Sequence, residues 1–147
     1  MHGQACRYPS VTLSVLVRLQ VGVDLTVFDT EAELHKIARA HPATRLLLRI
    51  RADDKAAMHS MGNKYGAEPQ ETMMLLQTAR SLNLNVVGVS FHVGSGASSP
   101  SAFPDAIALA RGVFNAGLAL GFTMSLLDIG GGFQGGRITP QVQAWSN

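Results

Sequence analysis

Cysteine and charged residues are both scarce in this sequence. Cys6 is the single cysteine among 147 residues, which excludes an internal disulfide framework and a cysteine-rich zinc site. Charged residues make up 15% of the chain, against about 25% in an average domain. The net charge is +2 without a block of one sign, so we expect no nucleic-acid partner. With 46% hydrophobic residues, the chain is long enough to form one domain around a core.

A long uninterrupted hydrophobic run is also missing. The most apolar stretch near the start, Val11–Val23, contains Arg18 and Gln20 and is shorter than the roughly 20 apolar residues that cross a bilayer. No small-residue cleavage pattern follows it, so it is a poor secretion signal. We therefore expect no membrane segment, and the single cysteine is typical of a protein of the reducing cytoplasm.

Four short segments have the pattern of β-strands. Residues 22–28 alternate apolar and polar side chains, with Val23, Leu25 and Val27 on one face. The run RLLLRI at residues 45–50 has no alternation and suits a strand buried on both faces. Residues 85–91 (NVVGVSF) and 122–128 (FTMSLLD) are the third and fourth predicted strands.

Helical patterns occupy the intervals between these strands. Thr30 and Glu33 form a capping box, and the helix that follows is expected to stop at Pro42. A second helix is predicted after Pro69 and a third ends near Gly117. The apolar positions that mark the three helices are Leu34, Ile37 and Ala38; Leu75, Leu76, Ala79 and Leu82; and Phe103, Ile107, Ala110 and Phe114.

The resulting order, β-α-β-α-β-α-β, predicts an α/β fold with a parallel sheet covered by helices. Two architectures are compatible with the pattern: part of a (β/α)8 barrel, or a small doubly wound sheet. A complete barrel needs about 250 residues, so this chain holds at most half of one.

The ends of the predicted strands carry the candidate site residues, because ligands of parallel α/β folds bind where strands meet the following loops. Asp128 opens the segment DIGGGF, in which Gly130, Gly131 and Gly132 either form a plain tight turn or direct their amides at an anion. The segment is neither a Walker loop nor a GxGxxG motif.

A second glycine-rich turn, HVGSG, begins at His92. His92 could stack on an aromatic ligand, act as an acid or base, or cap the turn, and Ser95 could bind a phosphate or its own backbone. Arg49 lies inside an apolar run and needs a partner, either Asp29 or Asp128 or a ligand. No histidines or carboxylates recur at metal-ligand spacing, and Ser95 lacks a nucleophile-elbow motif, so we predict no metal site and no serine nucleophile here.

These motifs together resemble one family. In order and spacing, residues 22–135 resemble the barrel domain of pyridoxal-phosphate-dependent ornithine decarboxylases, and antizyme inhibitors and arginine or diaminopimelate decarboxylases share weaker versions. The resemblance implies a partial (β/α)8 TIM barrel of the alanine racemase-like type, with about four βα units. Residues 1–21 and 136–147 match poorly. The segments that carry the resemblance are GVDLTVFD, EAELHKIARAHP, RLLLRI, VVGVSFHVGSG and LLDIGGGF.

The resemblance also implies roles for individual residues. His92 resembles the histidine that stacks on the pyridine ring of pyridoxal 5′-phosphate, and Ser95 resembles a serine that contacts the cofactor phosphate. Gly130, Gly131 and Gly132 resemble the loop whose backbone amides bind that phosphate. Arg49 resembles an arginine beneath the cofactor, and Lys64 a lysine of a mobile loop near the active site.

Several parts of the family's catalytic apparatus have no counterpart in this sequence. The family holds its cofactor as a Schiff base on a lysine of an early strand, and none of Lys36, Lys55 and Lys64 fits that position. The acid facing the pyridine nitrogen, a glycine-arginine phosphate clamp and a cysteine-aspartate pair shared across a homodimer interface are also missing. We therefore expect a fragment of an ornithine decarboxylase-like enzyme of polyamine biosynthesis, inactive alone.

The alternative is a regulator that resembles the antizyme inhibitors and keeps the fold without the chemistry. In the family, the antizyme-binding segment overlaps the region that resembles residues 22–36. Absence of the lysine is compatible with both interpretations.

Overall fold

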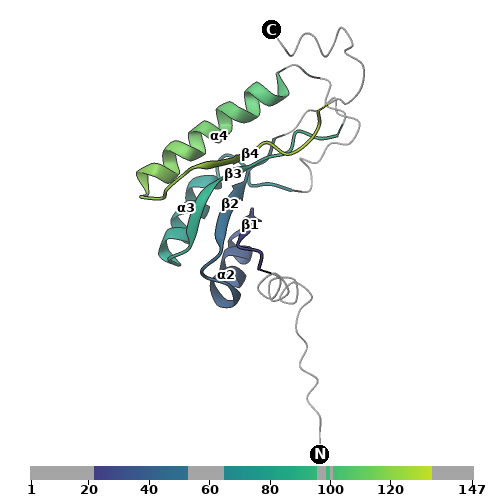
Figure 1. Ribbon diagram of the computed structural model, residues 1–147. Helices are drawn as coiled ribbons and strands as arrows, with labels where there is room; N and C mark the ends of the chain where they lie inside the picture. The colour runs from purple at the N-terminus through teal and green to yellow at the C-terminus, as the bar shows by residue number, and fades with distance from the viewer. Residues whose placement is uncertain (1–21, 53–64, 96–98, 100, 134–147) are drawn as a thin grey trace, which may run out of the picture.

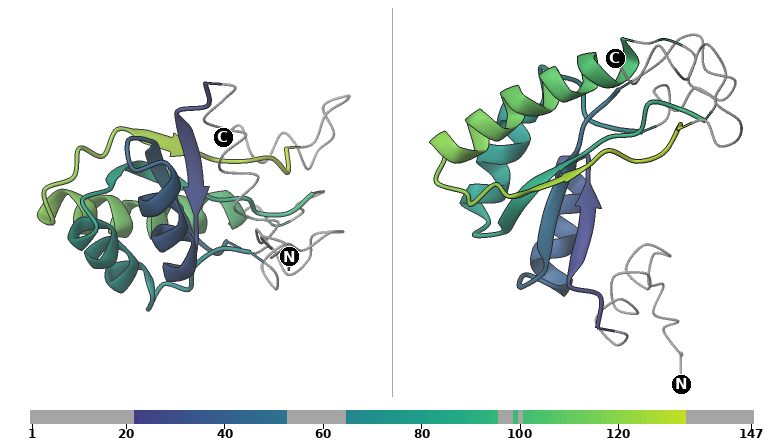
Figure 2. Two further views of the ribbon diagram at one scale, coloured as in Figure 1. Left: turned by 90° about the horizontal axis from the view of Figure 1, so that it is seen from below. Right: turned by 45° about the horizontal axis from the view of Figure 1, so that its top comes forward.

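The computed structural model describes residues 22–52, 65–95, 99 and 101–133. Strands and helices alternate along it, and the three helices lie on one side of a four-stranded sheet (Figures 1 and 2). The predicted α/β alternation is therefore confirmed. The elements are β1 (Leu25–Phe28), α2 (Glu31–Ala40), β2 (Arg45–Arg49), α3 (Thr72–Ser81), β3 (Asn85–Ser90), α4 (Ala102–Ala119) and β4 (Leu126–Asp128).

All strand pairs are parallel and follow the chain in the order β1-β2-β3-β4. Each strand is joined to the next by a helix, as parallel neighbours require. Leu46, Leu47 and Leu48 of β2 are all buried, which confirms the prediction of a strand covered on both faces. The pairing of β2 with β3 shifts register between Leu46 and Leu47.

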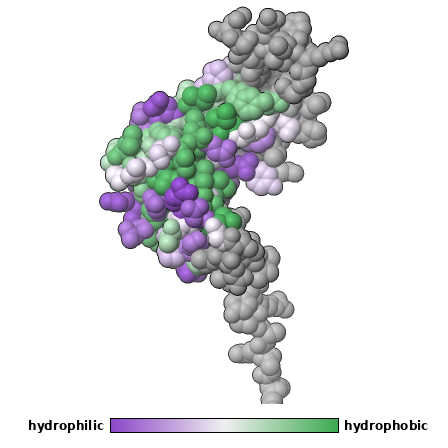
Figure 3. Space-filling view, in the orientation of Figure 1, coloured by the Kyte–Doolittle hydropathy of each residue, from purple (hydrophilic) through white to green (hydrophobic). Residues whose placement is uncertain are grey.

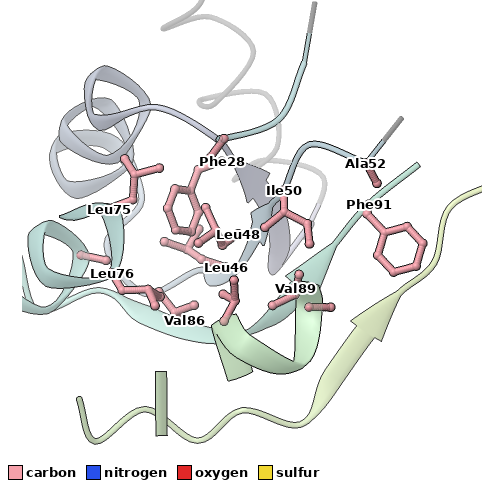
Figure 4. Packing of buried hydrophobic residues seen from close by; sticks show 14 of the residues in the cluster. Phe28, Leu46, Leu48, Ile50, Ala52, Leu75, Leu76, Val86, Val89 and Phe91 are labelled. Atoms are coloured by element: carbon pink, nitrogen blue, oxygen red, sulfur yellow. The ribbon is translucent and has the colours of Figure 1, made fainter. Parts of the chain in front are cut away.

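The main hydrophobic core lies between the sheet and the helices (Figure 4). Phe28, Leu46 and Val86 contribute from three neighbouring strands, and Leu75 and Leu76 contribute from α3. The start of α2 matches its sequence signal, because Thr30 Oγ1 accepts a hydrogen bond from the Glu33 amide at 3.3 Å. The carboxylate of Glu33 accepts from Lys36 at 3.0 Å.

Two sequence predictions in the last βα unit are wrong in detail. The fourth strand begins at Leu126 and not at residue 122, because Phe122 turns its ring into the core and its amide donates to Gly117 O. Ile107 was predicted on the buried face of α4, yet its side chain is 47% exposed. The helix packs instead through Phe103, Ala106, Ala110 and Val113. Ile107 follows Ala106 by one residue, which turns it about 100° away from the sheet.

The outer strands of the described sheet expose apolar side chains. Val23 and Val27 at β1, and Leu127 and Ile129 at β4, are between 37% and 43% exposed. A band of hydrophobic residues crosses the middle of the molecular face in Figure 3, with hydrophilic residues on both sides.

Candidate functional site

A row of polar residues crosses the sheet where the strands end. The parallel register places Arg49 opposite Ser90, and Ser90 opposite Asp128. Leu48 and Val89, one residue earlier on their strands, belong to the core beneath the helices. Because side chains alternate along a strand, the polar row lies on the face of the sheet away from the helices.

The two glycine-rich turns lie against each other, one after β3 and one after β4 (Figure 1). A methyl group on Gly131 would lie 3.2 Å from His92 Nε2, and one on Gly132 would lie 2.5 Å from Gly94 O. Gly130 and Gly132 have φ angles of +63° and +110°, which L side chains rarely adopt. The structure therefore brings the two sequence motifs together at one sheet edge.

The ring of His92 is held in one orientation by its own turn. The Gly94 amide donates a hydrogen bond of 2.9 Å to His92 Nδ1. A ring nitrogen that accepts a hydrogen bond carries no proton, so in the neutral ring the proton lies on Nε2. This nitrogen is the ring atom nearest the position of a methyl group on Gly131.

Three predicted phosphate-binding amides belong to the turn Gly130–Gly132, and they have different surroundings. The Gly130 amide donates to Asp128 Oδ1 at 2.9 Å. The amides of Gly131 and Gly132 donate no hydrogen bond to any atom of the described residues. Beyond the turn, the Phe133 ring stacks on Phe103 of α4 with centroids 4.5 Å apart. The turn thus presents two amides that have no partner in the described part of the chain, between two anchored ends, an arrangement suited to an anion.

Arg49 pairs with neither carboxylate that the sequence suggested. Its guanidinium lies over the Tyr65 ring, 5.1 Å from the centroid, and forms no ion pair within the described part of the chain. Asp29 Oδ2 accepts from the Gly66 amide at 2.9 Å, and Asp128 binds Gly130 and Ser90. The positive charge of Arg49 therefore remains available on the sheet face that carries the polar row.

Ser95 lies at the exposed end of the His92 turn. Two further residues of the site, Ser90 and Tyr65, were missed from the sequence. Ser90 could have been found as the one hydroxyl in the apolar run NVVGVSF, whereas Tyr65 has no signal beyond its place beside Lys64.

A hollow of about 560 Å³ lies next to this site, between the end of β1 and the start of α3. Asp29, Tyr65 and Glu68 line it, together with Arg51, which forms an ion pair with Glu68. The hollow meets the site at Tyr65, over which Arg49 lies, but none of the predicted cofactor-binding residues lines it.

Of the lysines, only Lys36 lies within the described residues. Its Nζ pairs with Glu33 at 3.0 Å on α2, which covers the opposite face of the sheet from the polar row. Lys55 and Lys64 lie outside the described residues, as do residues 1–21 and 136–147.

The described ranges also bear on two other features, a metal site and a membrane-spanning helix. No three His, Cys, Asp or Glu side chains gather there in a way that could hold a metal ion. No helix among the same residues combines the length and the hydrophobicity needed to cross a membrane.

Comparison with known proteins places this chain among sequences of one family. The family described as "Pyridoxal-dependent decarboxylase, pyridoxal binding domain" matches residues 12–145. Ornithine decarboxylase of Rattus norvegicus is 50% identical over 118 residues, which are 80% of this chain and 26% of that protein. Antizyme inhibitor 2 of Xenopus laevis is 46% identical over 114 residues, 78% of this chain and 25% of that protein. The chain thus spans about a quarter of the length of these relatives.

A similar solved structure is the arginine decarboxylase of Paramecium bursaria Chlorella virus bound to agmatine. It superposes with a TM-score of 0.86 at 37% identity, covering 92% of this chain and 38% of the viral one. The match to decarboxylase barrels confirms the prediction of a partial (β/α)8 barrel and excludes the doubly wound sheet.

The residues of the two turns fit a phosphorylated aromatic ring. Gly131 and Gly132 offer two amides that have no partner among the described residues, and side chains on Gly130 or Gly132 would collide with the backbone of the His92 turn. His92 offers a flat ring whose edge is held against this turn. Together with the sequence match over most of its length, this arrangement shows that the chain belongs to the pyridoxal-dependent decarboxylase family and carries its pyridoxal-binding domain.

Proposed function

We propose that the two glycine turns form the ring- and phosphate-binding part of a pyridoxal 5′-phosphate site in an ornithine decarboxylase-like protein. The observation that carries the proposal is the proximity of Gly131 to His92, where an added methyl group would lie 3.2 Å from the ring Nε2. It places an aromatic ring beside two amides that have no partner among the described residues. A dianionic phosphate favours such amides, and a flat heteroaromatic ring favours a flat partner.

Each predicted residue has a distinct part in this proposal. Gly131 and Gly132 donate amide hydrogen bonds to the phosphate, Gly130 shapes their turn, and the Ser95 hydroxyl contributes a further donor. His92 stacks on the pyridine ring, and Arg49 places a positive charge beneath it. When bound, the cofactor supplies an electron-withdrawing ring that stabilises the charge left as carbon dioxide departs.

We propose ornithine as the substrate of the complete site, with putrescine as the product. The ornithine decarboxylase relatives support this choice. A homodimer as the active assembly is implied by the family resemblance of the sequence motifs. The single cysteine is consistent with a cytoplasmic protein.

The cofactor site can be tested without enzyme turnover. Pyridoxamine 5′-phosphate has no aldehyde and does not react with surface lysines, so its binding to the purified chain can be measured by calorimetry. We expect His92→Ala to weaken binding about three- to tenfold, because a stacked pair is worth about 0.5–1.5 kcal/mol. His35→Ala, on α2 and paired only with Glu31, is the matched control. Equal affinity of wild type and His92→Ala for pyridoxamine 5′-phosphate would show that His92 does not stack on the ring.

We expect no release of carbon dioxide from ornithine by the purified chain, even with added pyridoxal 5′-phosphate. Lys36 is paired with Glu33 on the far side of the sheet, and no lysine of the described residues lies near the glycine turns. A radiolabelled carbon dioxide assay would check this expectation, and sustained turnover would refute it.

A regulator similar to the antizyme inhibitors is the second candidate, favoured by the match to the Xenopus protein. Residues 22–36 form β1 and the first half of α2, where Val23 and Val27 are exposed. This candidate predicts that the chain binds antizyme but not pyridoxamine 5′-phosphate, so the two binding measurements separate it from the cofactor site.

A further inference from the structure

The carboxylate of Asp128 connects the glycine turn to the neighbouring strand. Its Oδ1 accepts from the Gly130 amide at 2.9 Å, and its Oδ2 accepts from Ser90 Oγ at 2.9 Å. The backbone oxygen of Asp128 also accepts from the Phe91 amide at 2.9 Å. Every oxygen of this residue is therefore fixed to a different group.

The hydroxyl of Ser90 holds the second carboxylate oxygen of Asp128. The residue is 6% exposed and lies directly opposite Asp128 in the register of β3 and β4. Among the described residues, its hydroxyl has one hydrogen-bond partner, Asp128 Oδ2, although 38 residues separate the two in sequence. A carboxylate held at both oxygens has one orientation, and that orientation determines where the Gly130 amide points.

We propose that Asp128, held by Ser90, is a positioning residue for phosphate binding; this inference rests on the proposed cofactor site. By engaging the Gly130 amide at φ +63°, it fixes the start of the turn and leaves the amides of Gly131 and Gly132 free for the phosphate. The stack of Phe133 on Phe103 fixes the other end.

The charge of Asp128 itself opposes binding, because a carboxylate near a dianionic phosphate is repelled. Its contribution is therefore geometric. Asparagine can reproduce both hydrogen bonds, with Oδ1 accepting from Gly130 and Nδ2 donating to the Ser90 hydroxyl. A geometric role consequently predicts that Asp128→Asn keeps the affinity for the phosphorylated compound that Asp128→Ala loses.

The test compares pyridoxamine 5′-phosphate with pyridoxamine, which lacks the phosphate, on the full 147-residue chain. We expect Asp128→Ala to weaken binding of the phosphorylated compound about tenfold or more, because the turn loses the hydrogen bond that orients its first amide. Pyridoxamine binding should change less than about twofold, because these hydrogen bonds orient only the amides that face the phosphate. Asp128→Asn should bind the phosphorylated compound at least as tightly as wild type.

Ser90→Ala should weaken binding of the phosphorylated compound less than Asp128→Ala, because one of the two bonds to the carboxylate remains. Ser81→Ala is the matched control, since its hydroxyl donates to Thr78 O at the end of α3. An independent readout is the exchange rate of the Gly130 amide by NMR, which should rise in Asp128→Ala and remain low in Asp128→Asn.

The outcomes separate this inference from the function on which it rests. If the wild-type chain does not bind pyridoxamine 5′-phosphate, both the proposed cofactor site and the positioning role of Asp128 are refuted. If wild type binds and Asp128→Ala binds equally well, only the positioning role is overturned. Weak binding by both Asp128→Ala and Asp128→Asn would likewise refute a geometric role.

Discussion

Replacing Gly132 with alanine is expected to reduce affinity for pyridoxamine 5′-phosphate more than tenfold. The new methyl group would lie 2.5 Å from Gly94 O and 2.9 Å from Val93 Cγ2, and the φ angle of +110° is unfavourable for alanine. Gly94 O is a backbone atom, so the clash is relieved only if the two glycine turns separate. Overpacking of this kind costs about 1–3 kcal/mol, and about 1.4 kcal/mol corresponds to tenfold in affinity.

Gly112→Ala is the control for this variant. Gly112 lies on α4 with no atom within 4 Å of an added methyl group. Alanine there should leave affinity unchanged and stabilise the helix by about 1 kcal/mol. Calorimetry gives the affinities, and far-ultraviolet circular dichroism checks that both variants keep their helices. If Gly132→Ala bound as tightly as Gly112→Ala, the close contact of the two turns would have no part in binding.

Truncation of Leu48 to alanine is expected to have the largest effect on folding. Leu48 is completely buried in the core between the sheet and the helices, among side chains that include Phe28 and Ile50 (Figure 4). A cavity at such a position costs about 2–5 kcal/mol. Because whole domains are stable by only about 5–15 kcal/mol, the variant should lose a large part of its free energy of unfolding.

Leu118→Ala is the matched comparison, because Leu118 lies on α4 with 54% of its surface exposed. Substitutions at such exposed positions usually change stability by about 0.5 kcal/mol or less. Urea unfolding followed by circular dichroism measures both variants. Similar urea midpoints of unfolding for Leu48→Ala and Leu118→Ala would show that the core around Leu48 does not stabilise the fold.

The parts of the fold that were predictable depend on neighbours in sequence. The Thr30 cap involves residues three apart, and the RLLLRI run predicts burial of Leu46–Leu48 by its composition alone. The exposure of Ile107 was not predictable in this way, because two adjacent faces of α4 are both apolar and only packing against the sheet selects one. The choice of a barrel over a doubly wound sheet likewise needed the family resemblance.

The sequence by itself determined the alternation of strands and helices, the two glycine-rich turns and the residue types that suit a phosphorylated ring. The tertiary structure decided which of these groups meet. The proximity of Gly131 to His92 and the bond from Ser90 to Asp128 each involve residues 38 or more positions apart. Such contacts depend on the register of parallel strands, which is set by the packing of the whole sheet and leaves no local pattern in the chain.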